Sequence, residues 1–171
     1  MDTILFESTQ LNIRRFSPGD HEFVFELLNT PGWKKFIGDR NINTTDDAIA
    51  YIVNGPVASY ELRGYGLWLA ELKSTGQPIG MCGPVNRDYL DSPDLGFAFL
   101  PGFEGKGLAY EACMAALSYI KQNYTADSLY AITIPENIRS QRLLERCGFA
   151  QNGLITPSGD IPLLLYRLNL Q

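Results

Sequence analysis

The chain has 171 residues, 45% hydrophobic and 19% charged, which suffices to bury the core of one globular domain spanning 1–171. Its formal net charge of −5 argues against a nucleic acid as the main partner, because phosphate neutralisation needs clustered Lys and Arg. No apolar run approaches the length that crosses a membrane and Met1-Asp2-Thr3 begins no signal peptide, so we expect a cytoplasmic protein without a membrane partner.

Three strands and two helices are predicted in the first half of the chain. Alternating apolar and polar residues indicate strands, and apolar residues at helical spacing indicate helices. Asp20 is placed to cap the first helix, and Asn54-Gly55 is expected to end the second. In chain order we predict a strand over 11–16, a helix over 21–29, an irregular segment over 31–43, a helix from Thr44 or Thr45 to Val53, and strands over 66–72 and 78–85.

Residues 94–134 have the most regular pattern, a strand, a helix and a second strand. The strand over 94–100 alternates large and small side chains, and Pro101-Gly102 ends it. The helix is predicted over 107–122, and 129–134 is rich in β-branched and aromatic residues, which is typical of a strand. A unit of this kind pairs its two strands in parallel through a right-handed crossover.

A short helix and two further strands are predicted after this unit. Asn137 is expected to cap the helix, and Gly148 suits the left-handed position after its last residue. The two strands lie between Gly153 and the end of the chain, around a turn at 157–160. The predicted fold class is therefore α/β (α+β), a mixed and mostly antiparallel sheet with one parallel pair and helices on both faces.

The turn before the central helix has the composition of an anion site. Gly105 and Gly107 remove side chains where the helix begins, which leaves backbone N–H groups unpaired at the positive end of the helix dipole. The spacing fits neither a Walker loop, because Gly107 follows Lys106, nor a dinucleotide fingerprint, because position 110 is Tyr110. An ordinary glycine-rich turn without a ligand remains the alternative interpretation.

The context of this turn resembles the GNAT superfamily of acyl-CoA N-acyltransferases. The pyrophosphate loop of that family has Gln or Arg, two residues, Gly, one residue, then Gly or Ala, and this pattern falls on Glu104, Gly107 and Ala109. The strand over 94–101 and the segment 137–149 are also similar to the branch that includes the ribosomal-protein N-terminal acetyltransferases. Glu104 departs from the family pattern, and we expect its side chain to point to solvent and Lys106 to offset its charge.

The resemblance implies a GNAT-like sheet of about seven strands, with a splayed parallel pair and about four flanking helices. It also implies acetyl-CoA as co-substrate, with no metal, and direct transfer of the acetyl group to a primary amine through a ternary complex. The pantetheine arm is expected between the splayed strands and the diphosphate at the turn. The residues implied in coenzyme binding are Phe97, Ala98, Phe99, Glu104, Gly105, Lys106, Gly107, Leu108, Ala109, Tyr110 and Asn137.

Two residues are candidates for proton transfer. Asp94 stands where relatives often carry a glutamate, and it is either a general base acting through water or a strand-end carboxylate facing solvent. Many relatives use a Tyr to protonate the leaving thiolate, at the position of Leu144 here. Ser140, one turn earlier, is the substitute that the closer branch suggests, and surface or cap hydrogen bonding is its alternative role.

The acceptor is expected beside the first two helices, as in the resembling family. Trp33 and Phe36 either form its binding wall or pack in the core. A peptide or protein N-terminus and a small amine both remain open as acceptors, and so do a monomer and a homodimer.

Two interpretations without catalysis also remain open: a CoA-binding regulatory module without turnover, and a self-associating structural domain. The odd number and wide spacing of Cys82, Cys113 and Cys147 indicate free thiols rather than a metal site. We expect Cys147 to be a buried packing residue.

Overall fold

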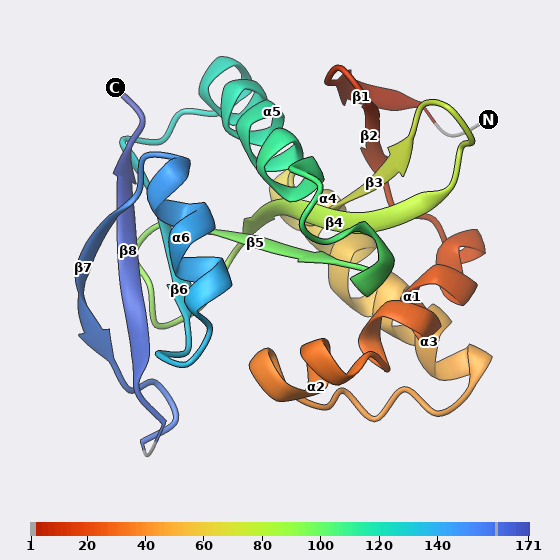
Figure 1. The fold of residues 1–171 in the computed structure, drawn as a ribbon, viewed down its shortest axis with the longest axis horizontal. Helices are drawn as coiled ribbons and strands as arrows, with labels where there is room; N and C mark the ends of the chain where they lie inside the picture. The colour runs from red at the N-terminus through yellow and green to blue at the C-terminus, as the bar shows by residue number, and fades with distance from the viewer. Residues whose placement is uncertain (1–2, 160) are drawn as a thin grey trace.

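The architecture is one twisted sheet with helices on both faces (Figure 1). The computed structural model describes residues 3–159 and 161–171, so Met1, Asp2 and Asp160 lie outside the described residues. The described sheet has eight strands in the order β1-β2-β3-β4-β5-β6-β8-β7. These strands are β1 (Ile4–Glu7), β2 (Leu11–Arg15), β3 (Trp68–Leu72), β4 (Pro78–Val85), β5 (Asp94–Phe99), β6 (Ser128–Thr133), β7 (Ala150–Ile155) and β8 (Leu163–Asn169).

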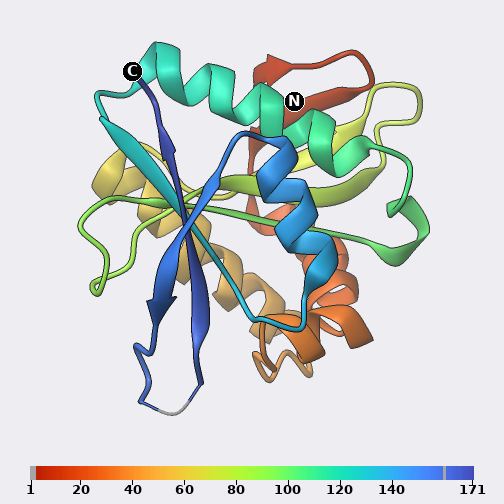
Figure 2. The ribbon, with the colours of Figure 1, turned by 60° about the vertical axis from the view of Figure 1, so that its left-hand side comes forward.

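The helices divide between the two faces of this sheet. In Figures 1 and 2, α5 and α6 cover one face, and α1, α2 and α3 cover the other. None of the described helices is long and apolar enough to cross a membrane. Their bounds are α1 (His21–Leu28), α2 (Pro31–Phe36), α3 (Thr45–Ile52), α4 (Ala58–Arg63), α5 (Leu108–Asn123) and α6 (Ile138–Arg146).

The period-two alternation of the strands separates two cores. Trp68 and Cys82 turn to one face and pack in a cluster with Leu117 of α5. Their neighbours Leu69 and Met81 turn to the other face, where they pack with apolar residues of α1 and α3. The described sheet is antiparallel throughout except for the β5–β6 pair. The predicted fold class is therefore confirmed.

The sheet has one strand more than the seven that the sequence predicted. The additional strand is β1, which lies at the edge of the sheet beside β2. Phe6 of β1 stacks on Tyr119 at 4.5 Å and meets Trp68 edge-on at 5.3 Å. These contacts join residues more than sixty positions apart, so no local pattern indicates the strand.

The helical segments between β2 and β3 are longer than predicted. The segment 31–43 was expected to be irregular, but α2 forms there because Thr30 caps it and Pro31 occupies its first turn. Asn54-Gly55 does not end α3, because the chain continues through a π-helical turn over Val53–Val57 into α4. Pro56 has no N–H to donate, and the wider π-helical turn lets the chain stay helical around this buried residue. The helix ends at Gly64, whose φ is 79°.

The two parallel strands of the central unit diverge. Their ladder consists of the single register pair Asp94↔Tyr130, supported by the hydrogen bond from Tyr130 N to Pro93 O at 2.9 Å. Beyond this pair β5 stays with β4, from Val85↔Asp94 to Gly80↔Phe99, while β6 follows β8 (Figure 2). Gly80 permits the close pairing, since a Cβ at that position would lie 2.2 Å from the Phe99 ring.

Candidate functional site

The loop that opens α5 presents a row of unused backbone donors. Gly105 and Gly107 have φ of 73° and 78°, the left-handed region that glycine adopts without strain, and Gly107 is the N-cap of α5. Within the described residues, the N–H groups of 105–110 donate no hydrogen bond to the protein. With the dipole of the sixteen-residue α5 behind them, these donors suit an anion such as a phosphate.

The side chains around these donors hold the loop in place. Leu108 is buried in the core, with 4% of its surface exposed. Arg146 of α6 lies over the Tyr110 ring at 4.4 Å, and Lys106 lies over the Phe103 ring at 5.5 Å. A hollow of 540 Å³, lined in part by Lys106, Gly107 and Tyr110, lies between the start of α5 and the β1–β2 turn at Ser8–Gln10.

Glu104 is exposed, as predicted, and its carboxylate is also paired. Oε2 accepts a hydrogen bond from Nη1 of Arg139 at 2.7 Å. Lys106 was expected to offset this charge, but its ammonium lies over Phe103 and the partner is Arg139. The physical reason is proximity in space: α6 begins beside the loop, although thirty-five positions separate the two residues in the sequence.

The diverging strands leave one edge of β5 without a partner strand. Backbone N–H and C=O groups alternate in direction along β5. Pro93 O accepts a hydrogen bond from β6, so the odd-numbered Phe97 and Phe99 direct their backbone groups to the gap. Leu100 N donates to β4, so the even-numbered Ala98 directs its backbone groups to β4. Ala98 is paired with Met81 and packs on the second core. Of the three strand residues predicted to bind coenzyme, Phe97 and Phe99 therefore present their backbone to the gap.

Asn137 and Ser140 both lie in the first turn of α6. Asn137 caps the helix, as predicted, with Oδ1 accepting a hydrogen bond from Ser140 N at 3.2 Å. The Ser140 hydroxyl forms no hydrogen bond in the part of the chain that the structure describes. Leu144, four residues later on the same face, is buried at 1% exposure. Ser140 is thus a half-buried polar residue on the same side of the helix as the buried Leu144.

Asp94 is buried and paired, and does not face solvent as its alternative interpretation held. Its side chain is 1% exposed, and Oδ1 accepts a hydrogen bond from Nε of Arg87 at 2.8 Å. Burial raises the pKa of Asp94, while the Arg87 guanidinium acts against this rise. The sequence reasoning missed Arg87, which lies in a polar loop. The sequence did contain a signal for this pair, because Arg87 lies seven residues before Asp94, the first residue of β5.

Trp33 and Phe36 do not share one surface. Trp33 is 6% exposed and packs in the core formed with α1 and α3, in agreement with the simpler of its two interpretations. Its indole Nε1 has no hydrogen-bond partner among the described residues. Phe36 is half-buried, with the Lys35 ammonium over its ring at 4.9 Å.

The three cysteines come together although they are far apart in the sequence. Cys82 and Cys113 have their sulfur atoms 3.7 Å apart, and all three thiols are free and buried. The thiol of Cys113 lowers the pKa of Cys147 by hydrogen bonding, against the opposing effect of burial. No group of described residues has the composition of a metal site.

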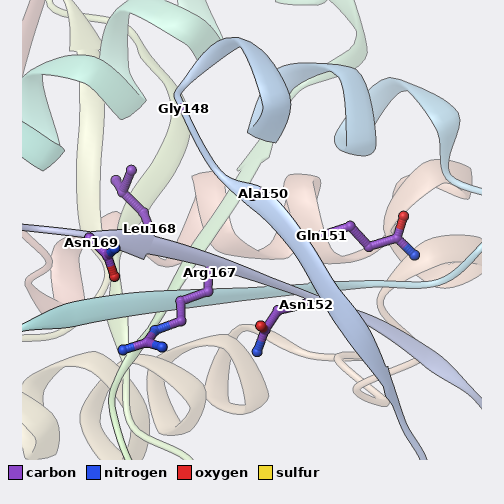
Figure 3. A pocket seen from close by; sticks show the side chains of 7 residues that line it. All are labelled: Gly148, Ala150, Gln151, Asn152, Arg167, Leu168 and Asn169. Atoms are coloured by element: carbon purple, nitrogen blue, oxygen red, sulfur yellow. The ribbon is translucent and has the colours of Figure 1, made fainter.

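A second hollow, of 410 Å³, lies on β7 and β8 (Figure 3). The structure places none of the predicted site residues in it. Its lining is mostly polar and consists of Gly148, Ala150, Gln151, Asn152, Arg167, Leu168 and Asn169.

Comparison with known protein families gives a match over most of the chain. The family model described as "Acetyltransferase (GNAT) domain" matches residues 10–150. The N-acetyltransferase YnaD of Bacillus subtilis is 33% identical over 144 residues, which cover 84% of this chain and 81% of YnaD. The B. subtilis protein YkkB is 34% identical over 90 residues, covering 50% of this chain, and the chain spans 52% of its length.

A shorter sequence match and two solved structures are also acetyltransferases. The [ribosomal protein uS5]-alanine N-acetyltransferase of Escherichia coli is 37% identical over 69 residues, 40% of this chain and 36% of that protein. An acetyltransferase from Agrobacterium tumefaciens has a TM-score of 0.81 at 22% identity, covering 96% of this chain and 93% of its own. The ribosomal-protein acetyltransferase RimL in complex with coenzyme A has a TM-score of 0.81 at 12% identity, covering 98% of both chains. At these identities the structures establish the shared fold.

Proposed function

The chain belongs to the acetyltransferase (GNAT) domain family, and from this premise we propose that it transfers the acetyl group of acetyl-CoA directly to a primary amine. The acceptor is a protein or peptide N-terminus or a small amine. The single observation that supports this most strongly is the row of free N–H groups over 105–110, beside the gap between β5 and β6. A cytoplasmic location and a monomeric or homodimeric state belong to the same proposal.

The residues of this row and gap fit the coenzyme. The N–H groups at the start of α5 would hold the diphosphate, and the edge of β5 at Phe97 and Phe99 would pair with the pantetheine arm. When bound, acetyl-CoA supplies an acetyl thioester. A β5 N–H directed at the thioester oxygen would stabilise the oxyanion of the transition state, and one such donor is worth about 3 kcal/mol.

The reaction balances without a further reactant. The amine nitrogen attacks the thioester carbon, an N–C bond forms, the C–S bond breaks, and the thiolate takes up a proton. Asp94, buried and held by Arg87, is the proposed base that receives the amine proton through water. Ser140, whose hydroxyl is unbonded within the described residues, is the proposed donor that protonates the thiolate and is reprotonated by water, while Asp94 returns its proton to water.

The demand on the base depends on the acceptor. At pH 7 roughly one in ten α-amines is neutral, compared with about one in 2,500 lysine side chains. An α-amine therefore reacts mainly through positioning. This favours an N-terminal or other low-pKa amine, and the uS5-alanine N-acetyltransferase among the relatives is consistent with it.

The second candidate is a CoA-binding regulatory module without turnover. Three observations favour it: Leu144 occupies the place of the family's Tyr, Glu104 brings a negative charge to the loop, and Asp94 is only 1% exposed. Such a module would bind coenzyme in the same place and leave the thioester intact.

One experiment separates these candidates. Acetyl-CoA is added to the protein with a panel of peptides and small amines, while CoA release and the melting temperature are followed. A thermal shift with CoA release supports the transferase, and a shift without release on any amine supports the regulatory module. No thermal shift with any acyl-CoA would remove both.

A further inference from the structure

The first turn of α5 carries an acid whose carboxylate is bound to the β1–β2 turn by three hydrogen bonds. Oε1 of Glu111 accepts from Ser8 Oγ at 2.6 Å and from Gln10 N at 2.6 Å, and Oε2 accepts from Gln10 Nε2 at 2.9 Å. Hydrogen bonds to an ionised carboxylate are charge-assisted and stronger than those between neutral groups. The two partners lie 103 and 101 positions from Glu111 in the sequence, so only the fold brings them together.

The turn that binds Glu111 is itself fixed in the sheet. Ser8 N donates to Leu11 O at 2.9 Å, and Ser8 Oγ accepts from Leu11 N at 3.2 Å. Gln10 O accepts from Lys73 N at 2.9 Å, which joins the turn to the residue after β3. Leu11 is fully buried in the core beneath α5. The Glu111 carboxylate is therefore attached to the sheet and not to a loose loop.

The backbone of Glu111 belongs to the start of the helix that carries the free N–H groups. Its N–H donates to Gly107 O at 3.0 Å, and Gly107 is the N-cap of α5. Glu111 thus makes the bond that begins the hydrogen-bonded ladder of α5. Because the first turn is a rigid unit, the position of the Glu111 side chain fixes the direction of the N–H groups before it.

Hydrogen bonding rather than packing joins the two elements at this point. The hollow of 540 Å³ lies between them, and its lining includes Ser8, Gln10, Gly107 and Glu111. Among the described residues, the first turn of α5 bonds to the β1–β2 turn through Glu111 alone. Since side chains do not fill this space, the carboxylate sets the distance between the two elements.

The loop before α5 is held from its other side by α6. In Figure 1, α6 lies on one side of α5, and β1 and β2 lie on the other. Arg139 pairs with Glu104 at 2.7 Å, and Arg146 lies over the Tyr110 ring at 4.4 Å. Both arginines are exposed, so solvent weakens these contacts, whereas Glu111 is half-buried and accepts three bonds. The link to the β1–β2 turn is therefore the stronger of the two.

A negative charge at this position would oppose an anionic ligand if its only effect were electrostatic. Burial acts against ionisation, but hydrogen bonds from Ser8 and Gln10 outweigh it and lower the pKa of Glu111, so the carboxylate is ionised at neutral pH. An acid beside the proposed diphosphate site therefore needs another reason, and its three bonds supply one.

We propose that Glu111 is a positioning residue for the coenzyme, which holds the N–H groups over 105–110 in the direction that binds the diphosphate. It acts through Gly107 and the first turn of α5, without contacting the ligand. The inference rests on the proposed function, because it adds a residue to the coenzyme site of that reaction. It also gives β1 a role in the site, since the β1–β2 turn supplies all three donors.

Glu111→Ala tests this role by the sign of its effect on coenzyme binding. The variant removes a negative charge beside the N–H groups, so electrostatics alone predicts a lower Kd for acetyl-CoA. It also removes all three hydrogen bonds, and the positioning role predicts a higher Kd. We expect calorimetry to show Kd raised about tenfold, the size of a lost charge-assisted hydrogen bond. In turnover, KM for acetyl-CoA should rise and KM for the amine should stay the same.

Ser8 provides a second test that leaves the charge in place. Ser8→Ala removes the bond from Ser8 Oγ to Glu111 and should raise Kd by a smaller factor. Ser8→Thr keeps a hydroxyl and should restore the wild-type Kd. These two variants decide the matter if Glu111→Ala does not fold.

Asp47→Ala is the matched control for a loss of stability. Asp47 Oδ2 accepts hydrogen bonds from Asn43 N at 2.9 Å and Thr44 N at 2.8 Å at the start of α3, on the other face of the sheet. Asp47→Ala and Glu111→Ala should both lower the melting temperature. Only Glu111→Ala should raise Kd for acetyl-CoA.

The outcomes separate the positioning role from the transferase. If the wild type binds acetyl-CoA, an unchanged or lower Kd in Glu111→Ala overturns the positioning role and leaves the transferase intact, and so does an equal rise in Asp47→Ala. If the wild type binds no acyl-CoA, the proposed function fails, and ¹⁵N relaxation of the protein alone decides. Lower order parameters at Gly105 and Gly107 in Glu111→Ala, but not in Asp47→Ala, support the positioning of the loop, and equal values overturn it.

Discussion

Glu104 Oε2 lies 2.7 Å from Nη1 of Arg139, and this pair ties the loop before α5 to the first turn of α6. Both side chains are largely exposed, at 41% and 67%, so solvent screens the pair and it contributes little to folding. Its significance lies in its position beside the free N–H groups of the loop. A carboxylate there opposes an anionic ligand, and it also engages the Arg139 guanidinium.

Replacing Glu104 by Gln is therefore expected to strengthen coenzyme binding. The variant removes a negative charge and leaves Arg139 available to the diphosphate, so Kd for acetyl-CoA should fall several-fold at low salt and less at high salt. Calorimetry measures this. Glu136→Gln is the matched control, because Glu136 is an exposed acid shortly before α6. Weaker binding by Glu104→Gln would show that Glu104 supports the loop rather than opposing the ligand.

Two glycines with the same backbone conformation allow a test of the anion site. Gly107 and Gly76 have φ of 78° and 70°, and a Cβ at either position would contact nothing within 4 Å. A change of either to Val should therefore cost a similar stability of about 1–2 kcal/mol through backbone strain. Only Gly107→Val should abolish the thermal shift caused by acetyl-CoA. Equal shifts in the two variants would place the coenzyme elsewhere.

The Asp94–Arg87 pair predicts a pH dependence of activity. Because burial raises the pKa of Asp94 above its ordinary value, the acidic limb of the kcat/KM profile should lie above that of an exposed carboxylate. Arg87→Gln removes the cation that lowers this pKa, so the limb should move to higher pH, whereas Arg87→Lys should move it less. A limb that is unchanged in Arg87→Gln and in Asp94→Asn would exclude Asp94 as the base.

The same raised pKa has a consequence for folding. The folded state binds the Asp94 proton more tightly than the unfolded state, so this stabilising contribution is present below the unfolded pKa of 3.8 and is lost as pH rises through the folded pKa. Asp94→Asn should therefore become less destabilising relative to the wild type as pH rises from the unfolded pKa through the folded pKa. Urea unfolding across pH measures the difference, and a constant difference would contradict it.

Ser140 can be tested apart from stability. Its hydroxyl forms no hydrogen bond in the described structure, so Ser140→Ala should leave the melting temperature nearly unchanged. As proton donor to the thiolate its loss should lower kcat by about 10²-fold, with little change in KM for acetyl-CoA. Ser118→Ala, an exposed serine within α5, is the control. Full activity in Ser140→Ala would show that water, and not Ser140, protonates the thiolate.

What the sequence predicts well is what neighbouring residues determine. The strand–helix–strand unit, the left-handed Gly148 and the Asn137 cap all follow from patterns within a few positions, and the structure has them. The roles of Asp94, Ser140 and the coenzyme-binding residues stay predictions.

What it does not predict depends on contacts across the fold. β1 is held by Phe6 against Trp68 and Tyr119, and α4 exists because the chain continues helical through Pro56. Arg139 lies thirty-five positions from Glu104 and pairs with it only because the fold brings α6 beside the loop before α5. Charge pairing of this kind leaves no periodic trace in the sequence.

The single register pair between β5 and β6 makes the sheet two half-sheets, five strands on one side and three on the other. Along the rest of the β5–β6 boundary, α5 and α6 contact both halves, and the two strand edges form no hydrogen bonds with each other. A bound molecule with amide groups of its own would form hydrogen bonds with these edges. Slowed amide hydrogen exchange along both edges would then report the ligand as a structural element, a ninth strand that the chain does not encode.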